Sequence, residues 1–260
     1  MFDIRRVDLA KLNSMTKYPS ILTYHTLGDK GVLRDSIQIP FTGRVMGTEK
    51  VDGTNSRIIF CPDGSVLLGS REDLLWERRD LIGNPAMGII DILRDTVHRL
   101  APAVCQPGRI AAYFVESYGR NIGAGAKNYS RHGAAGFRLF DLLIVDNYEE
   151  LLDWPAARIA LWRDQGGQRY VDADQLQSIA TEIGFQTVPA LFEFDARQLP
   201  TQIDETYQFL LSFAQSRCKL DEQADGVPEG VVVRSADRSQ IAKLRREDYE
   251  RTLKRSAKKN

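Results

Sequence analysis

The chain has 260 residues, of which 43% are hydrophobic, and its 35 basic residues balance 35 acidic ones, so the formal net charge at pH 7 is zero. This composition suffices for a buried core in one large domain, or at most two small ones, and it excludes a disordered chain. It also provides no whole-chain charge to attract a polyanion, and no apolar run approaches the roughly 18 residues of a membrane-spanning helix.

Cysteines and histidines form no recognisable site. The cysteines are widely spaced, which is typical of neither a disulfide framework nor a zinc site; they are Cys61, Cys105 and Cys218. The histidines lie far apart and are interpreted as structural or exposed rather than as metal ligands; they are His25, His98 and His132. Because the start of the chain is mixed and charged, unlike a signal peptide, we expect a cytoplasmic protein with no membrane partner.

Residues 1–40 predict a short helix or extended arm followed by loops. The stretch 41–70 predicts three strands, broken by Asp52-Gly53, which is typical of a hairpin turn, and by Pro62-Asp63-Gly64. The charged stretch 73–80 predicts a helix. A second helix is predicted over 88–100, where apolar residues recur at helical spacing until Pro102 and Pro107-Gly108 end it.

Two near-continuous apolar runs, 110–115 and 139–145, predict buried central strands. Between them, residues 119–136 contain five glycines with several basic side chains. This composition predicts a mobile loop. It is either a flap that faces nucleic acid or phosphate, or a plain surface connection.

The remainder predicts helices and strands in alternation. We expect helices over 148–154, 174–183 (with Asp172 or Asp174 as N-cap) and 203–213, and strands over 188–194, 230–234 and 240–244. A basic helix is expected over 247–255. Between Lys243 and Asn260 eight basic residues stand against three acidic ones, so this end either touches phosphates or is a solvated amphipathic helix.

The most informative stretch is residues 49–55, Glu-Lys-Val-Asp-Gly-Thr-Asn, which places Lys50 at the end of a predicted strand. A lysine is a nucleophile only as the free amine, and an ordinary lysine pKa near 10.4 leaves almost none of that form at pH 7. Cationic or desolvating neighbours would have to lower the pKa of Lys50. Taken alone, this stretch favours a solvated lysine beside a turn.

Five further segments change that interpretation. In chain order they are Ser70-Arg71, Tyr113–Gly119, Phe137–Leu142, Glu229–Arg234 and Ile241–Arg245. With residues 49–55, these segments resemble motifs I, Ia, III, IIIa, IV and V of the covalent nucleotidyltransferases, which comprise DNA ligases, RNA ligases and mRNA capping enzymes. The resemblance spans residues 49–245, most of the chain.

The resemblance implies a lysine nucleophile. The Lys50 amine would attack the α-phosphorus of ATP to give lysyl-AMP and pyrophosphate, AMP would pass to a 5′-phosphate end, and a 3′-hydroxyl would displace AMP. Because each step builds negative charge on a phosphate, positioning and cationic stabilisation must supply the catalysis. Lys243 and Arg245, two residues apart on one strand, would point both cations to the α-phosphate and lower the pKa of Lys50. Arg245 departs from the lysine common in RNA ligases, so a rigid fork replaces a point charge.

The resemblance also implies the remaining contacts. Glu229 would hold Mg²⁺ or Mn²⁺, since a hard cation prefers carboxylate oxygen. Phe140 would stack on the adenine, although a phenylalanine in an apolar strand otherwise packs in the core. The other implied nucleotide contacts are Glu116 to the ribose, Arg71 to the sugar or phosphates, Glu49 to the base, and Asn55 to the nucleotide or the RNA terminus. Val51 is also counted among the nucleotide-binding residues.

Two features favour the RNA ligase 2 type. The continuation Gly53-Thr54-Asn55 is similar to that type, whereas DNA ligases and capping enzymes place arginine at the position of Asn55. Only fifteen residues follow Arg245, too few for the five-stranded OB-fold of the other branches. Asp52 points the other way, because many relatives of the RNA ligase 2 type carry histidine there. The short leader, residues 1–40, cannot form the upstream domain of NAD-dependent DNA ligases, which favours ATP as donor.

We therefore expect an α+β fold of two mainly antiparallel sheets, ATP-grasp-like and without a C-terminal OB-fold. Residues 1–260 would form one nucleotidyltransferase domain, with an N-terminal arm over 1–40 and a basic helix over 246–260. The expected function is ATP-dependent joining of RNA 3′-hydroxyl and 5′-phosphate ends in RNA repair. The alternatives are a DNA or nick-sealing ligase, and a nucleic-acid-binding module without catalysis.

Overall fold

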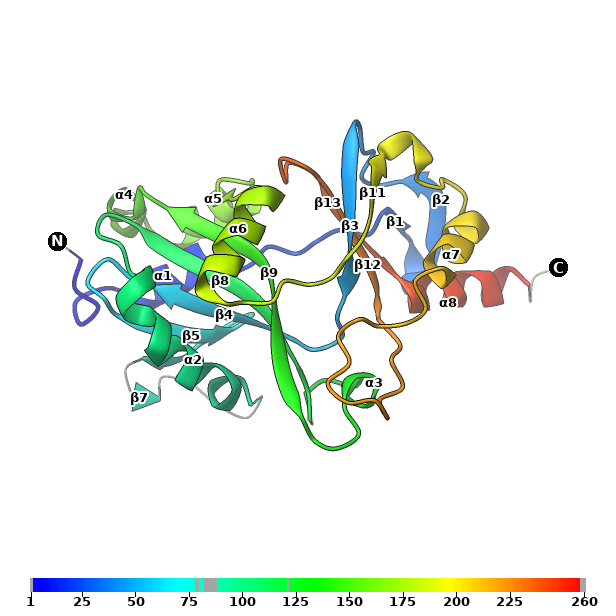
Figure 1. Ribbon diagram of the computed structural model, residues 1–260. Helices are drawn as coiled ribbons and strands as arrows, with labels where there is room; N and C mark the ends of the chain where they lie inside the picture. Colours follow the sequence, from blue (N-terminus) through cyan, green and yellow to red (C-terminus); the bar gives the residue numbers. More distant parts are fainter. Residues whose placement is uncertain (1, 78–79, 82–87, 121, 258–260) are drawn as a thin grey trace. The chain divides into compact units, whose positions relative to one another are not determined.

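Two large sheets, each with its own helices, carry the fold of this computed structural model, which describes residues 2–77, 80–81, 88–120 and 122–257 (Figure 1). Every strand ladder among these residues is antiparallel. The predicted α+β class with antiparallel sheets is thus confirmed. The chain divides into two compact units: unit 1 is Met1–Pro19, Gly53–Tyr118 and Ala135–Thr187, and unit 2 is Ser20–Asp52, Gly119–Ala134 and Val188–Asn260.

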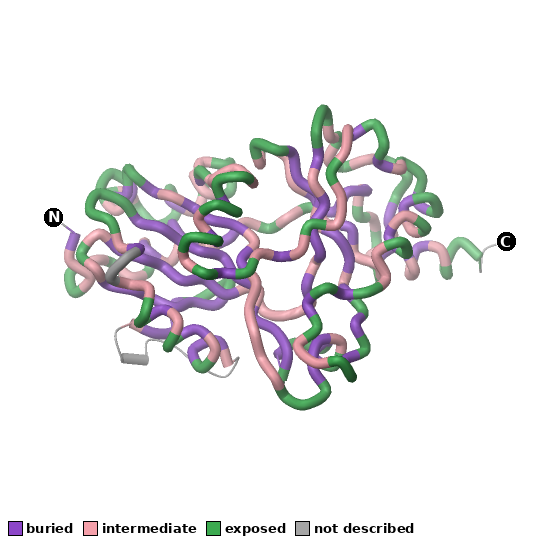
Figure 2. The backbone as a smooth tube through the Cα atoms, viewed as in Figure 1, coloured by how far each residue is buried: buried purple, intermediate pink, exposed green. Residues whose placement is uncertain are grey.

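Unit 1 is built on a seven-stranded sheet of order β10-β9-β8-β4-β5-β6-β7. Its strands are β4 (Thr54–Phe60), β5 (Val66–Ser70), β6 (Leu74–Glu77), β7 (Asp80–Leu81), β8 (Ile110–Gly119), β9 (Ala135–Val145) and β10 (Arg169–Tyr170). The central strands are buried along almost their whole length (Figure 2). One face packs in the core with α2 (Ile89–Val104) and α6 (Ala173–Ile183).

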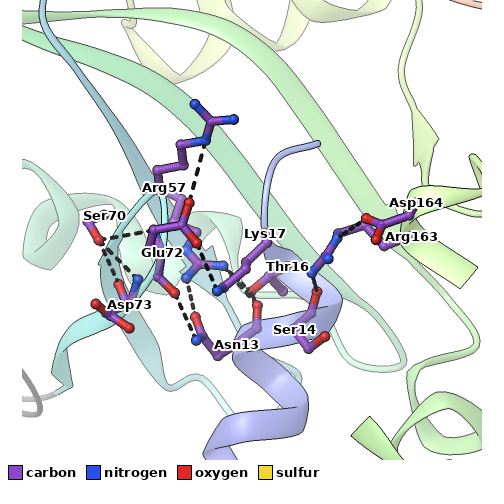
Figure 3. A network of polar contacts seen from close by, with 11 residues as sticks. Asn13, Ser14, Thr16, Lys17, Arg57, Ser70, Glu72, Asp73, Arg163 and Asp164 are labelled. Carbon is purple, nitrogen blue, oxygen red and sulfur yellow. Dashed lines mark hydrogen bonds and ion pairs between the residues drawn. The ribbon is translucent and has the colours of Figure 1, made fainter. Parts of the chain in front are cut away.

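The other face of this sheet contacts α1 (Leu9–Thr16), which also packs beside α4 (Tyr148–Asp153) and α5 (Ala156–Asp164). Arg57 alternates with the core residue Ile58 along β4 and so points to the α1 face. Its guanidinium donates to Asn13 O at 3.0 Å and to Thr16 Oγ1 at 3.1 Å (Figure 3). These bonds tie α1 to the sheet.

Unit 2 is built on a four-stranded sheet of order β11-β3-β12-β13. Its strands are β3 (Arg44–Lys50), β11 (Ala190–Asp195), β12 (Gly230–Ser235) and β13 (Ile241–Arg245). The core on one face includes residues of α7 (Ile203–Leu211) and α8 (Arg246–Ser256). The smaller elements are the ribbon β1 (His25–Leu27) and β2 (Leu33–Ile37), the 3-10 turns η1 (Asp29–Gly31) and η2 (Ala196–Gln198), and α3 (Ala126–Tyr129).

The hairpin predicted at Asp52-Gly53 is wrong. β3 belongs to the sheet of unit 2 and β4 to that of unit 1, and they share no ladder. Gly53 serves close packing instead, because a Cβ there would lie 2.3 Å from the Ser117 carbonyl oxygen. Apolar alternation on both sides of a turn dipeptide indicates two strands, but it does not say which partners they take.

Three other predictions need correction. The helix expected over 73–80 is wrong, because β6 and β7 occupy the described part of it, with residues 78–79 outside the described residues. Pro102 does not end the preceding helix, since α2 continues to Val104. The stretch 119–136, predicted as a loop, contains the short helix α3 with a fully buried Tyr129 and the start of β9.

Most other elements are confirmed. The helices expected over 148–154, 174–183, 203–213 and 247–255 correspond to α4, α6, α7 and α8, and α6 has Asp172 as its N-cap in a capping box. Residues 1–40 are shared between the units, with α1 in unit 1 and the β1–β2 ribbon in unit 2. No helix among the described residues is long and apolar enough to cross a bilayer.

Candidate active site

The register of unit 2's sheet gathers the predicted cations. On β12, Gly230 lies opposite Lys50 of β3 on one side and opposite Arg245 of β13 on the other. Val232, two residues along, lies opposite Lys243. Directly paired residues, and residues two apart on a strand, share a face of the sheet. Lys50, Lys243 and Arg245 therefore project from one face.

Glu229 joins this group at the start of β12. Its N–H donates to the Lys50 carbonyl oxygen at 3.1 Å, and its own carbonyl accepts from Arg246 N at 3.0 Å. Its carboxylate forms an ion pair with the Lys50 ammonium, and both side chains are 23% exposed. The backbone ladder thus fixes the carboxylate beside the predicted nucleophile, within reach of solvent.

Gly230 allows β12 and β13 to approach each other closely. A Cβ at this position would lie 2.0 Å from the Leu244 carbonyl oxygen and 3.0 Å from the Arg245 Cα. No side chain fits there without moving the backbone of β13. The glycine of the Glu-Gly-Val-Val segment is therefore required by the packing of β12 against β13.

Arg245 is held by a bidentate ion pair. Its Nε and a terminal nitrogen lie 2.8 and 2.9 Å from the Asp248 carboxylate, whose side chain is 1% exposed. Asp248 also binds Arg251 at 3.0 Å. Burial lowers the pKa of Arg245, but the hydrogen bond and the attraction of Asp248, with smaller contributions from Glu229 and Glu247, outweigh burial and raise it. The guanidinium is a fixed positive charge.

Glu49 points away from this group. It alternates with Lys50 on β3, so its side chain lies on the opposite face of the sheet, where it is 1% exposed. One carboxylate oxygen accepts from the Ser216 hydroxyl, and the other accepts from Arg217 N at 2.8 Å. Val51, next to Lys50, is also buried. The contact predicted between Glu49 and the base, and the nucleotide-binding role predicted for Val51, stay predictions.

Asp52 adds a carboxyl group near Lys50. Burial raises the pKa of Asp52, the negative charges of Glu229 and Glu247 raise it further, and the charge of Lys50 opposes them. Its N–H donates to the Tyr129 hydroxyl at 2.7 Å. Asp52, where many relatives of the RNA ligase 2 type carry histidine, is thus a partly buried acid whose charge interacts with Lys50 and Glu229.

The other predicted site residues lie in unit 1. Asn55 pairs with Glu116 across β4 and β8, so both side chains share a face, and a Glu116 oxygen accepts from Gly53 N at 3.2 Å. Asn55 Oδ1 is buried and has no hydrogen-bond partner among the described residues. This carbonyl oxygen is an acceptor that a ligand could satisfy.

Phe140 and Arg71 complete the set in unit 1. The Phe140 ring is partly buried and lies edge-on to Tyr18, with centroids 5.1 Å apart. It contributes to an aromatic cluster with Tyr18 and Phe114, so core packing accounts for part of its surface. Arg71 is 51% exposed, with Nε 3.6 Å from Glu72. Their predicted contacts with the nucleotide stay predictions.

Comparison with known protein families gives a match over most of the chain. The family model described as RNA ligase matches residues 43–254. The chain belongs to the RNA ligase family. The matched range includes Lys50, Glu229, Lys243 and Arg245 and reaches into both units.

Solved structures of RNA ligases share the fold of this family member. An archaeal ATP-dependent RNA ligase is 15% identical, with a TM-score of 0.54 over 90% of this chain and 49% of that one. Naegleria gruberi RNA ligase with PPi is 16% identical, with a TM-score of 0.52 over 92% of this chain and 64% of that one. A mutant of the same ligase with ATP and Mn is 17% identical, with a TM-score of 0.52 over 92% of this chain and 62% of that one.

The chain therefore spans about half to two thirds of the length of these structures. At such low identity, the likeness shows the fold alone. The comparison with curated proteins found no match.

Sequence reasoning missed one basic residue of this RNA ligase family member. Arg234 lies opposite Met46 on β3 and Ile241 on β13, and by strand alternation it shares the face of Lys50, Lys243 and Arg245. It is only 7% exposed. The signal was present, since Arg234 follows Val232 by two residues in a predicted strand.

Glu229 could bind a divalent metal together with the phosphates of a substrate. Within residues 2–77, 80–81, 88–120 and 122–257, no group of three or more histidine, cysteine or acidic side chains could hold a metal by itself. Mg²⁺ in nucleotide enzymes is commonly held by one or two carboxylates together with substrate phosphates. Glu229, partly exposed beside Lys50, supplies such a carboxylate.

Proposed function

We propose that this RNA ligase family member is an ATP-dependent RNA ligase that joins 3′-hydroxyl and 5′-phosphate ends through lysyl-AMP and RNA-adenylate intermediates. The observation that carries the proposal is the strand register that places Lys50 and Arg245 on either side of Gly230, with Lys243 on the same face of the sheet. The Glu229 carboxylate forms an ion pair with the Lys50 amine beside them. The family match and the neighbours named with ATP, Mn and PPi support the choice of donor.

In the first step, the Lys50 amine in its neutral form makes a bond from its nitrogen to the α-phosphorus, and the bond from that phosphorus to pyrophosphate breaks so that pyrophosphate leaves. The proton that the nitrogen sheds passes to solvent, which reaches this partly exposed side chain. Lys243 and Arg245 bind the oxygens on which negative charge develops. Such electrostatic stabilisation by fixed charges is usually the largest single contribution to the catalysis of these transfers. Glu229 holds the amine through their ion pair. Glu229 would hold a Mg²⁺ or Mn²⁺ ion, which would supply positive charge to neutralise the phosphates.

Residues in unit 1 are proposed to recognise the nucleoside. Glu116 accepts from the ribose, Phe140 stacks on the adenine, and Arg71 contacts the sugar or phosphates. Asn55 contributes its unpartnered carbonyl oxygen to the nucleotide or the RNA end. Glu49 would approach the base through its backbone, because its carboxylate is bonded on the other face of β3, and Val51 would complete the nucleotide-binding residues. Residues 1–260 would together form one ATP-grasp-like nucleotidyltransferase domain that acts in RNA repair.

The decisive test is covalent labelling. Purified protein incubated with radiolabelled ATP and Mg²⁺ should form an AMP adduct that is lost in Lys50→Ala. It should be retained in Lys254→Ala, which removes a 77% exposed lysine from α8. Parallel reactions with GTP and NAD identify the donor. Label that persists in Lys50→Ala contradicts the assignment of the nucleophile.

The second candidate function is that of a DNA-joining ligase, because aspartate at the position of Asp52 is common to DNA ligases. A panel of nicked duplexes with RNA or DNA on the 3′-hydroxyl side separates the two. Sealing that requires RNA on that side supports the RNA ligase, whereas equal sealing of all-DNA nicks supports a DNA-joining enzyme.

A further inference from the structure

Two segments of unit 2 that are far apart in the sequence hold the end of β3 on either side of Lys50. Tyr129 of α3 is fully buried, and its hydroxyl oxygen accepts from Asp52 N at 2.7 Å, two residues beyond Lys50. The Asp52 carboxylate also packs on Gly125, where a Cβ would lie 2.2 Å from its Oδ2. The backbone that follows Lys50 is thus fixed by the segment around α3.

The residue before Lys50 is held by the other segment, which precedes β12. Both oxygens of the buried Glu49 carboxylate are bonded, one to the Ser216 hydroxyl and one to Arg217 N. Ser216 is itself 8% exposed and accepts from Cys218 N at 3.0 Å through the same hydroxyl. The Glu49 side chain is therefore anchored on the face of β3 opposite Lys50.

The two segments are bonded to each other as well. Leu220 N donates to Tyr129 O at 2.8 Å, Gly226 N to Asn128 O at 2.8 Å, and Ser216 N to Gly226 O at 2.7 Å. The Arg131 guanidinium forms an ion pair with Asp225. Residues 125–131 and 216–226 thus form one hydrogen-bonded clamp, which we call the strand clamp, and it grips β3 at Glu49 and Asp52.

We propose that Tyr129 and Ser216 are positioning residues for the nucleophile: through the strand clamp they set where the Lys50 amine stands relative to Glu229 and Arg245. This inference rests on the proposed function and deepens it, since neither residue belongs to the six motifs. Neither residue touches the reacting atoms. They act through the backbone on each side of Lys50, where a displacement of about 1 Å can reduce a rate roughly a hundredfold.

The test separates the first chemical step from the last. Tyr129→Phe keeps the buried ring and removes only the hydroxyl, and Ser216→Ala removes the bond to Glu49. Each variant is assayed for covalent AMP formation from ATP, which requires attack by Lys50. It is also assayed for sealing of a synthetic RNA already adenylated at its 5′ end, which requires no attack by Lys50.

We expect both variants to form lysyl-AMP roughly ten- to a hundredfold more slowly, mainly in kcat rather than in the KM for ATP, and to seal the pre-adenylated RNA within about threefold of wild type. Ser216→Thr, which keeps a hydroxyl, should restore the first step. Tyr207→Phe is the matched control, because its hydroxyl bonds to Glu250 at 3.2 Å in the same unit and lies outside the clamp.

Folding is checked by thermal unfolding before either assay. If Tyr129→Phe does not fold, Gly125→Ala probes the same contact, because its Cβ would push on the Asp52 carboxylate. Folded variants that lose both reactions equally, or neither, overturn the inference. A wild type that forms no lysyl-AMP overturns the proposed function instead, so the two failures are distinguishable.

Discussion

Lys50 and Arg245 lie opposite the same residue, Gly230, on the two sides of β12. Neighbouring strands are about 4.8 Å apart, so two strands on either side of a third place the Cα atoms roughly 10 Å from each other. Both side chains are long enough to meet at a common phosphate across that distance. The glycine between them contributes no side chain that would shield either charge.

Replacing this glycine should therefore damage both the sheet and the chemistry. In Gly230→Ala, the added Cβ would lie 2.0 Å from the Leu244 carbonyl oxygen, and β13 must move away. We expect a loss of about 2–3 kcal/mol in the free energy of unfolding and strongly reduced AMP labelling. Denaturant unfolding and the labelling assay measure the two effects. Val232→Ala is the control for a general effect of substitutions on β12. Normal labelling by Gly230→Ala would show that the site does not need the close approach of β12 and β13.

A second prediction concerns the anchor of Arg245. Asp248 is 1% exposed and binds both Arg245 and Arg251. Asp248→Asn leaves two guanidinium groups with a neutral partner. Because those groups are 29% and 33% exposed, we expect a loss of about 2 kcal/mol rather than the larger value of a fully buried pair.

The loss should be visible in denaturant unfolding, and AMP transfer should slow because the arginine fork is no longer fixed. Glu247→Gln is the matched control. Glu247 lies in the same turn of α8 and contacts the same two arginines, but it is 65% exposed, so its removal should change stability by less than about 0.5 kcal/mol. Equal effects of the two substitutions would show that burial of Asp248 is unimportant.

Periodicity in the sequence predicted most of the elements, because β12, β13 and the helices α4, α6, α7 and α8 have clear apolar repeats or capping residues. It failed at Asp52-Gly53. There the chain leaves one sheet and enters another, and pairing partners depend on contacts distant in sequence. It failed again at 73–80, where charged residues at the start concealed the buried strand residues Leu74, Leu75 and Trp76.

For the site, the motifs predicted a set of side chains, and strand alternation correctly placed two of them, Lys243 and Arg245, on one face. The residues that support the site could not be found in this way. Tyr129 and Ser216 carry no motif, and their contacts with Asp52 and Glu49 arise only when segments more than 75 residues apart fold together. The packing role of Gly125 likewise depends on a residue distant in sequence, because only the fold brings the Asp52 carboxylate against it.

A pH prediction follows from His25. Its ring is fully buried, with Nδ1 2.9 Å from the Tyr249 hydroxyl and Nε2 2.9 Å from the Thr201 carbonyl oxygen. Burial lowers the pKa of His25, opposed by the Thr201 bond and the charge of Asp35. With the folded pKa below the unfolded value near 6.5, the unfolded state binds the extra proton first as pH falls.

The stability linked to His25 is therefore fully present above about pH 6.5 and declines below it. The free energy of unfolding of wild type, measured between pH 8 and 5, should fall more than that of His25→Gln, which carries no group that titrates in this interval. Parallel pH profiles for the two proteins would contradict a neutral buried imidazole.

The last prediction concerns Arg57, whose side chain is completely buried in unit 1. Burial lowers the pKa of Arg57 to about 9, so the guanidinium still carries its charge at pH 7. Its bonds go to Asn13 and Thr16 of α1, which are neutral groups (Figure 3). Two opposing effects decide the outcome of Arg57→Met. Removing a buried charge relieves its desolvation, whereas each buried acceptor that loses its donor costs about 1–3 kcal/mol.

Because Asn13 and Thr16 would both lose a donor, the second effect should win, and we expect Arg57→Met to destabilise the protein by about 2 kcal/mol. The N-terminal segment should also become easier to cleave by limited proteolysis, since Arg57 ties α1 to the sheet. Lys17→Met is the control, because its ion pair with Glu72 is exposed on the Glu72 side and should contribute under about 1 kcal/mol. A stability for Arg57→Met equal to or above wild type would mean that desolvation of the guanidinium outweighs its three bonds to α1.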